Sequence, residues 1–174
     1  MASNTDPKNK LLHIETGILN KKNAFVVLVK TEWNASIVDE LEKGCVAELK
    51  KNSVKKIISL TVPGAFEIPF AIKRFWDTYK KLPAGRKGKR PDAFIALGCV
   101  IRGETPHFNY IAKAVTEGVV QLNLILPVPT IFGVLTVENE VQAKHRIGGK
   151  HGHNGERAAI TAIKMINLHP RKLK

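Results

Sequence analysis

The chain carries the uninterrupted apolar run AFVVLV at residues 24–29. Its length and its β-branched valines predict a buried β-strand. Because polar residues do not alternate with the apolar ones, both faces of this strand are expected to be covered, as they are in a parallel sheet. The run therefore indicates a layered α/β fold.

Further apolar runs alternate with segments of helical pattern along the rest of the chain. After the first strand, Ile37, Leu41, Cys45 and Leu49 recur on one helical face. This alternation predicts a three-layer α/β sandwich with a central, mostly parallel four-stranded sheet flanked by helices, a flavodoxin-like layering. The other predicted strands span residues 54–62, 93–97 and 130–136, and the other predicted helices span residues 66–79, 105–122, 138–146 and 155–167.

A length of 174 residues fits a single domain. Residues 1–12 are rich in Asn, Asp, Pro and Lys, which is typical of a flexible amino-terminal arm. We expect one domain over residues 13–168 and a basic carboxyl-terminal tail over residues 169–174.

The cysteine count and the hydropathy pattern limit the class of protein. The two cysteines, Cys45 and Cys99, are too few for a disulfide-rich secreted module. The longest uncharged stretch, residues 118–137, contains Pro127 and Pro129 and is expected to be a helix end, a turn and a strand rather than a membrane span. We expect a soluble protein of the cytoplasm with no membrane segment.

The chain has 28 Lys and Arg against 15 Asp and Glu, a formal net charge of +13. Such an excess allows a nucleic-acid partner. However, the basic residues gather in the loop at residues 80–90 and near both ends of the chain, without interleaved aromatic side chains on which bases could stack. A solvated surface is therefore the main interpretation, and polyanion binding is the alternative.

In open parallel sheets, ligands bind beyond the carboxyl ends of the strands, so those ends are where chemistry is expected. The first strand is followed by KTEWN at residues 30–34, in which Trp33 could stack on a flat ring or cap the core. The second is followed by VPGAFEIP at residues 62–69. There Gly64 permits a close backbone approach, and Glu67 is either a carboxylate that favours the start of a helix or an acceptor for substrate hydroxyls.

The third strand is followed by GCVIRGETPHF at residues 98–108. Thr105 is predicted to cap a helix whose first residue is Pro106, and amides at such a helix start can hold a phosphate. His107 could exchange protons with a substrate near neutral pH, or it could be a solvent-facing histidine. The charge of Glu104 would oppose phosphate, and Cys99 is expected to be a small apolar wall rather than a nucleophile.

A further basic candidate, Arg146, ends the helix predicted at residues 138–146 and precedes a glycine-rich turn. Arginine there could bind phosphate through two hydrogen bonds or could serve the helix dipole. His151 and His153 have the spacing of a metal-binding pair, but no carboxylate or cysteine lies near them in the sequence, so no metal site is predicted.

Together these motifs resemble the lumazine synthase family over residues 24–168. They are VPGAFEIP, GCVIRGETPHF, IFGVLTVENEVQAKHR at residues 131–146, the turn GGKHG, and the helix start at residues 156–159. The resemblance implies an enzyme of riboflavin biosynthesis, a transferase without cofactor or metal. Its substrates would be 5-amino-6-(D-ribitylamino)uracil and 3,4-dihydroxy-2-butanone 4-phosphate, and its product 6,7-dimethyl-8-ribityllumazine.

The resemblance also implies a role for each matched site residue. His107 matches the family's proton donor, and the aromatic at Trp33 lies against the uracil ring. Phe132 and Arg146 are expected to reach the site from a neighbouring subunit, with Arg146 as the cation for phosphate. The remaining implied substrate-binding residues are Asn34 beside Trp33; Ala65, Phe66 and Glu67 for the ribityl chain; Cys99, Val100 and Ile101 for the pyrimidine edge; and Glu104 and Thr105 near the phosphate.

Family members form pentamers, and in many of them pentamers close into an icosahedral shell. The resemblance therefore implies a homopentamer, with a 60-subunit shell and an association with riboflavin synthase as further expectations. A free pentamer and a decamer are the alternatives to the shell. One position departs from the family pattern: many members have a lysine that assists phosphate binding where this chain has Asn154. His153, Lys150 or the helix amides are the alternatives that could compensate for it.

Two other functions compete with the synthase. One is a basic shell or binding module that holds nucleic acid and has lost catalysis through the change at Asn154. The other is a riboflavin synthase of the archaeal type, which shares ancestry with the synthase.

Overall fold

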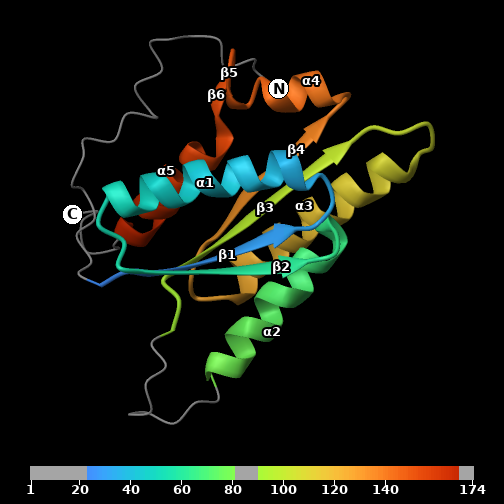
Figure 1. The fold of residues 1–174 in the computed structure, drawn as a ribbon. Helices are drawn as coiled ribbons and strands as arrows, with labels where there is room; N and C mark the ends of the chain where they lie inside the picture. The colour runs from blue at the N-terminus through green and yellow to red at the C-terminus, as the bar shows by residue number, and fades with distance from the viewer. Residues whose placement is uncertain (1–22, 81–89, 169–174) are drawn as a thin grey trace.

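Phe25–Thr31 forms strand β1, as the opening apolar run predicts. The computed structural model describes residues 23–80 and 90–168, and every structural statement below concerns these residues. The remaining elements, labelled in Figure 1, are α1 (Ala35–Lys51), β2 (Lys56–Val62), the 3-10 turn η2 (Ala65–Glu67), α2 (Ile68–Lys80), β3 (Ala93–Ile101), α3 (His107–Ile125), β4 (Thr130–Val137), α4 (Glu140–Lys144), β5 (Ile147–Gly149), β6 (Gly152–His153) and α5 (Asn154–Asn167).

The four long strands form one parallel sheet in the order β2-β1-β3-β4. At the centre, Leu28 of β1 lies opposite Ser59 of β2 on one side and Ile95 of β3 on the other. The order reverses between β1 and β3, because the chain adds β2 on one side of β1 and then returns to add β3 on the other. The predicted α/β architecture with a parallel four-stranded sheet is confirmed.

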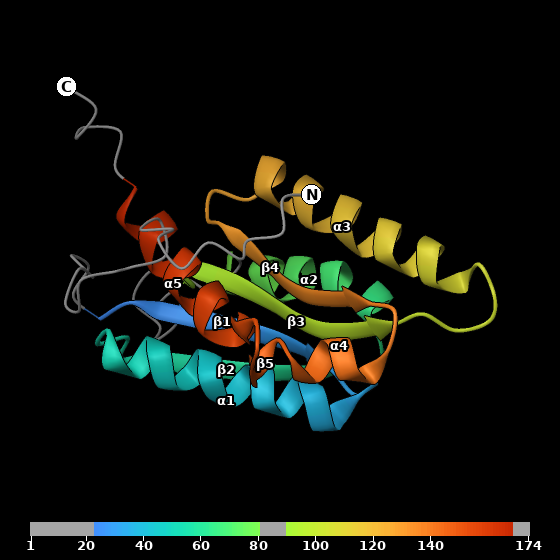
Figure 2. The ribbon, with the colours of Figure 1, turned by 90° about the horizontal axis from the view of Figure 1, so that it is seen from above.

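Helices cover both faces of the sheet, with α2 and α3 on one side and α1 and α5 on the other (Figure 2). Successive β1 residues point to opposite faces. Phe25, Val27 and Val29 pack towards α2 and α3, whereas Val26 and Leu28 pack towards α1 and α5, and all five are fully buried. This two-sided burial explains the continuous apolar run, since none of residues 25–29 faces water.

Helices α1 and α5 approach each other through glycines. A Cβ atom at Gly155 would collide with the carbonyl oxygen of Leu41, and one at Gly44 would collide with the imidazole ring of His153. Neither glycine has a positive φ, so the requirement is for space rather than for an unusual backbone conformation. The contact joins the first helix of the fold to the last.

Several predicted boundaries differ from the structure. Strand β3 continues to Ile101 instead of ending at residue 97, because its last residues pair with β4 alone. The helix predicted at residues 66–79 is divided into η2 and α2. The β5–β6 hairpin was not predicted, because three- and two-residue strands rich in glycine carry no hydrophobic pattern.

Parts of the sequence prediction lie outside the described residues. They are the amino-terminal arm, the carboxyl-terminal tail and most of the basic loop, at residues 81–89. The predicted domain boundaries therefore stay predictions. Within the described ranges, no helix is both long enough and apolar enough to cross a membrane.

The α1–α5 contact generates the first prediction. Gly155→Ala should lower the free energy of unfolding by ~1–3 kcal/mol, the usual cost of forcing extra atoms into a packed interior. The new methyl group meets backbone, which cannot rotate away. Urea unfolding followed by circular dichroism measures the change.

Gly103→Ala is the matched control. A Cβ atom at Gly103 meets nothing within 4 Å. Its effect on stability should stay within ~0.5 kcal/mol. Equal free energies of unfolding for the two variants would show that α1 and α5 can move apart without loss of stability.

Candidate functional site

A cavity of about 700 Å³ lies at the carboxyl ends of β1, β2 and β3, next to the point where the strand order reverses. This is the position at which open parallel sheets bind ligands. The residues that line the cavity are Thr31, Trp33, Asn34, Pro63, Gly64, Ala65, Phe66, Glu67, Cys99, Val100, Ile101, His107 and Ile111. The cavity thus brings together nine of the predicted site residues from three separate strand ends.

The turn after β1 is held by the side chain of Asn34. This residue adopts a left-handed backbone with φ 59°, and its amide nitrogen Nδ2 donates a hydrogen bond to the carbonyl of Cys99, 2.8 Å away. Asparagine tolerates the left-handed region better than most residues. The bond therefore fixes the turn after β1 to the end of β3 across the switch point.

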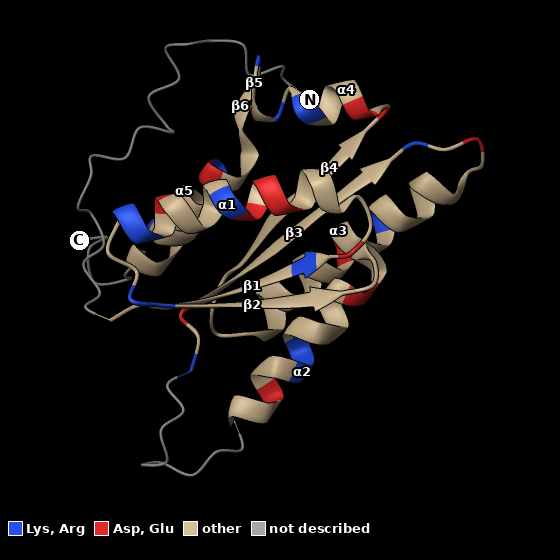
Figure 3. Cartoon of the chain, in the orientation of Figure 1, with Lys and Arg blue, Asp and Glu red and all other residues tan. Residues whose placement is uncertain are grey.

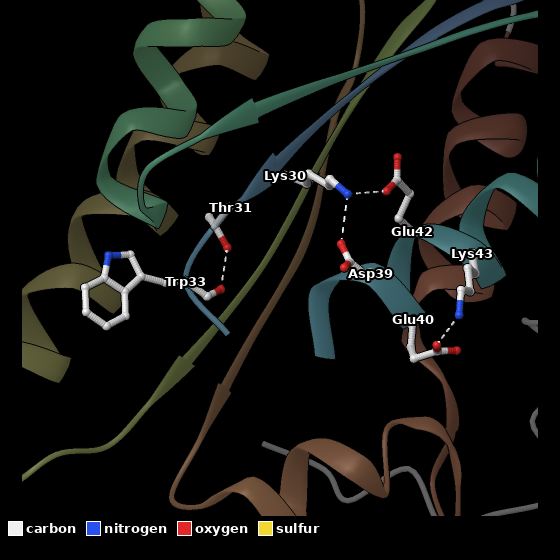
Figure 4. A network of polar contacts seen from close by, with 7 residues as sticks. All are labelled: Lys30, Thr31, Trp33, Asp39, Glu40, Glu42 and Lys43. Carbon is white, nitrogen blue, oxygen red and sulfur yellow. Dashed lines mark hydrogen bonds and ion pairs between the residues drawn. The ribbon is translucent and has the colours of Figure 1, made fainter. Parts of the chain in front are cut away.

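Thr31 fixes the other side of the same turn. Its hydroxyl donates to the carbonyl oxygen of Trp33 at 3.2 Å, while the Trp33 ring points away from this bond (Figure 4). Trp33 lines the cavity. The ring is 73% exposed, which is incompatible with the alternative that Trp33 caps the core. Sequence reasoning missed Thr31, whose only signal is its place at the strand end.

Lys30 points to the opposite side of β1 and fixes helix α1 there (Figure 4). Its ammonium group lies 2.9 Å from Asp39 Oδ1 and 2.5 Å from Glu42 Oε2. Hydrogen bonds to Asp39 and Glu42 raise the pKa of Lys30 above its usual value. The strand end that carries Trp33 is therefore joined to the helix that follows it.

The segment after β2 forms the second wall. A Cβ atom at Gly64 would lie 3.0 Å from Glu67 Oε2 and 3.7 Å from the Trp33 ring, so Gly64 lies close to both side chains. Phe66 is 60% exposed at the rim. Glu67 ends the 3-10 turn η2 and is exposed, so it does not lie in the first turn of an α-helix as the sequence predicted.

The end of β3 offers unpaired backbone to the cavity. Pairing of β1 with β3 ends at Lys30 and Leu97, whereas pairing of β3 with β4 continues to Ile101. Beyond Leu97, the β1-facing edge of β3 therefore has no strand neighbour among the described residues. Amides and carbonyls on such an edge can bind a flat ring that carries its own donors and acceptors.

Cys99 forms a largely buried wall of this edge, as predicted. Burial raises the pKa of its thiol to about 11. The thiolate needed for nucleophilic chemistry is therefore scarce at neutral pH.

The start of α3 differs from the prediction. Pro106 rather than Thr105 occupies the N-cap position, and no side-chain hydrogen bond caps the helix. His107 is the first residue of α3 and lies exposed at the cavity. Glu104 and Thr105 are exposed in the preceding loop and do not line the cavity.

Arg102 fixes this loop, and sequence reasoning missed it. Its Nε donates to Glu138 Oε2 at 2.6 Å, and its guanidinium carbon lies 4.2 Å from the centre of the Phe108 ring. These contacts tie the loop before His107 to the end of β4 and to the first turn of α3. The only sequence signal was the position of Arg102 between strand and helix.

Phe132 and Arg146 lie outside the cavity that contains His107. Phe132 of β4 pairs with Ala96 of β3, whereas Cys99, which lines the first cavity, pairs with Leu135. The two pairs are three residues apart, so Phe132 lies ~10 Å from the level of Cys99 along the strands. It lines a second cavity, of about 910 Å³, between β4 and α5. Arg146 donates from Nη1 to the carbonyl of Gln142 at 2.7 Å.

The glycine-rich turn forms the β5–β6 hairpin, and His153 uses its Nδ1 to cap helix α5. This nitrogen accepts from the amides of Gly155 and Glu156, at 3.2 and 3.4 Å. His153 and the helix amides were two of the groups proposed to bind phosphate in place of the lysine that Asn154 replaces. The imidazole and the amides of Gly155 and Glu156 are hydrogen-bonded to each other instead. Among the described residues, no group of three His, Cys, Asp or Glu could hold a metal ion.

Charges on the described surface are mixed in sign. Lys and Arg alternate with Asp and Glu along the helices in Figure 3, and several form ion pairs one turn apart, such as Lys73 with Asp77 and Lys144 with Glu140. Most of the positive excess lies on residues outside the described ranges. The described surface therefore offers no support for the nucleic-acid alternative.

Comparisons with known proteins show which family the chain resembles. The family model described as 6,7-dimethyl-8-ribityllumazine synthase matches residues 23–170. A protein of that name from Parabacteroides distasonis is 44% identical over 143 residues, covering 81% of this chain and 83% of the relative. One from Cytophaga hutchinsonii is 45% identical over 151 residues, covering 86% and 89%, and one from Christiangramia forsetii is 37% identical over 166 residues, covering 94% of each.

The buried thiol generates a prediction about pH. At pH 8, iodoacetamide should label Cys99 about a hundredfold more slowly than it labels an ordinary thiol, because the pKa is raised from 9.0 to about 11. Between pH 9 and pH 10 the rate should rise about ninefold, whereas the rate for an ordinary thiol of pKa 9.0 should less than double. Site-resolved mass spectrometry gives the rate, and urea-unfolded protein is the control; equal rates in both states would contradict the assignment.

Proposed function

Because the chain belongs to the 6,7-dimethyl-8-ribityllumazine synthase family, we propose that the cavity beside β3 binds the pyrimidine substrate and that a second copy of the chain completes the site. The enzyme is a transferase of riboflavin biosynthesis. It condenses 5-amino-6-(D-ribitylamino)uracil with 3,4-dihydroxy-2-butanone 4-phosphate and releases 6,7-dimethyl-8-ribityllumazine, phosphate and water. The observation that carries the proposal is the exposed Trp33 ring beside the open backbone edge of β3.

The pyrimidine ring fits between these two features. The indole of Trp33 stacks on its face, and Asn34 keeps that indole in place through its bond to Cys99. The backbone of Val100 and Ile101 lies on the strand edge that β1 leaves unpaired, where it meets the donors and acceptors of the uracil. Only backbone groups are needed there, which agrees with the apolar side chains of this segment.

The ribityl chain lies along the segment after β2. The exposed carboxylate of Glu67 accepts hydrogen bonds from its hydroxyl groups, and Ala65 and Phe66 supply backbone and an apolar rim. Gly64 leaves the space between Glu67 and Trp33 in which the chain joins the ring. Ring and chain are therefore held by two neighbouring strand ends.

The substrate brings its own amine nucleophile, so the protein needs no nucleophilic side chain. Attack on the ketone, loss of phosphate and ring closure all move protons, and His107 at the rim is the group that transfers them. Holding both substrates in register contributes as well, since orientation alone can lower a barrier by ~7–11 kcal/mol.

The second substrate requires a cation that the first cavity lacks. Arg146 and Phe132 supply the phosphate-binding half from a neighbouring subunit, which is consistent with their position outside the His107 cavity. A cyclic homopentamer satisfies this arrangement, because each chain gives one half to each neighbour. Assembly of pentamers into an icosahedral shell and a location in the cytoplasm belong to the same proposal.

The role of His107 is tested by His107→Asn. The variant should lower kcat by about 10²–10⁴, the usual contribution of a positioned acid or base, and should leave both KM values within a few fold. Lumazine formation measured by absorbance gives both quantities. Lys113→Gln, on the exposed face of the same helix, is the control and should match the parent enzyme. An unchanged kcat in His107→Asn would remove this residue from the mechanism.

The shared site is tested by mixing two inactive chains. Equal amounts of His107→Ala and Arg146→Ala chains, unfolded together and refolded, should regain activity at about a quarter of their interfaces, where an intact His107 meets an intact Arg146. Each variant refolded alone should stay inactive. No recovery in the mixture, with oligomers of parental size, would mean that one chain supplies both residues.

A further inference from the structure

Arg157 lines the second cavity together with Asn154 and Phe132. It lies in the first turn of α5, and its guanidinium nitrogen Nη1 donates to Asn154 Oδ1 at 3.2 Å. A cation in the first turn opposes the helix dipole, so helix stability does not account for an arginine at this position. The groups that its side chain faces must account for it instead.

The guanidinium has more donors than the chain uses. An arginine carries five N–H donors, and the hydrogen bond to Asn154 takes one of them. No carboxylate among the described residues forms an ion pair with Arg157, although Glu156 is its sequence neighbour. The amide of Asn154 orients the guanidinium without neutralising it.

Arg157 belongs to a cluster of positive groups around the β5–β6 hairpin. A Cβ atom at Gly152 would lie 3.1 Å from Arg157 Nη2, which places the guanidinium over this hairpin. The backbone amide of Asn154 donates a hydrogen bond to the backbone carbonyl of Arg146 at 2.8 Å. The segments that carry the two arginines are therefore directly hydrogen-bonded. Partial burial and then the charges of Arg146, Lys150, His145 and Arg157 lower the pKa of His151.

Neighbouring positive charges repel one another, and a bound anion relieves that repulsion. His153 is not the group that binds the anion, since its Nδ1 accepts the amides of Gly155 and Glu156. Those two amides are occupied for the same reason. Lys150 is exposed at the hairpin turn and does not line the cavity.

We infer that Arg157, oriented by Asn154, binds the phosphate group of the butanone phosphate in the cavity between β4 and α5. The inference rests on the shared site proposed above, in which this face of one chain meets the His107 cavity of the next. A guanidinium offers phosphate two parallel hydrogen bonds, which fixes the orientation of the substrate as well as its charge. Arg157 thus places a cation beside Asn154, which is itself uncharged.

The experiment compares steady-state kinetics of the assembled parent enzyme with Arg157→Gln, which retains a hydrogen-bonding side chain but loses the charge. The KM for 3,4-dihydroxy-2-butanone 4-phosphate and the inhibition constant of inorganic phosphate should both rise about tenfold to a hundredfold. The KM for the ribitylaminouracil should change less than threefold. Arg157→Lys should recover only part of the loss, because it restores the charge but not the two parallel hydrogen bonds.

Two controls separate Arg157 from other cations and from general damage. Lys150→Gln removes a charge from the same cluster, and Arg74→Gln removes an exposed arginine from α2 on the opposite face of the sheet. Both should keep the phosphate-substrate KM within threefold of the parent. An Arg157→Gln variant that folds normally but has a parental KM for that substrate overturns the inference. So does a rise in this KM that appears in Lys150→Gln and not in Arg157→Gln.

The mixed-chain experiment and the Arg157→Gln kinetics together distinguish a failure of the Arg157 assignment from a failure of the shared site. If mixed chains regain activity while Arg157→Gln binds inorganic phosphate like the parent, only the assignment to Arg157 fails. If mixed chains do not regain activity but Arg157→Gln still binds inorganic phosphate more weakly than the parent, the assignment to Arg157 stands and the shared arrangement fails.

Discussion

The parallel pairing of β1 with β3 is the constraint on which the rest of the molecule depends. Both strands are buried on both faces, so the chain must leave each of them by a helix that covers one side of the sheet. Because β2 is added to one side of β1 and β3 to the other, the connections diverge where β1 and β3 end. The crevice between them is a consequence of chain topology, and no residue had to be chosen to create it.

Particular residues determine how rigidly the crevice is fixed. β1 stops at Thr31 while β3 continues to Ile101, and this difference in length exposes backbone that a shorter β3 would lack. The Asn34–Cys99 hydrogen bond then closes the turn at one point of the open edge and leaves the rest accessible. Lys30, bonded to two carboxylates of α1, works from the other face of the same strand. The ring of Trp33 is exposed, yet the backbone that carries it is fixed from three directions.

Sequence patterns predicted the parts of this arrangement that depend on burial. The runs at residues 24–29 and 93–97 located the central strands, because a short run that is apolar at every position is typical of a strand covered on both faces. The pattern could not predict the end of β3, since Cys99–Ile101 fits a strand or a loop equally well until β4 is seen beside it. Thr31 and Arg102 were missed because neither the bond from Thr31 to backbone nor the contacts of Arg102 with Glu138 and Phe108 leave a periodic signal in the sequence. The cap on α5 was missed because histidine is an unusual N-cap.

The two cavities differ in a way that bears on how a condensing enzyme of this family works. The cavity beside β3 is lined by aromatic, apolar and backbone groups with one carboxylate, Glu67, which would repel a phosphate. The cavity beside β4 contains Arg157 and lies next to Arg146, which suits a phosphate and offers no ring-stacking indole. One chain therefore keeps the Glu67 carboxylate in a different cavity from the Arg157 guanidinium. If the two halves meet only between neighbouring copies, each substrate enters an environment suited to its own charge, and the reacting atoms approach each other only where the two chains join.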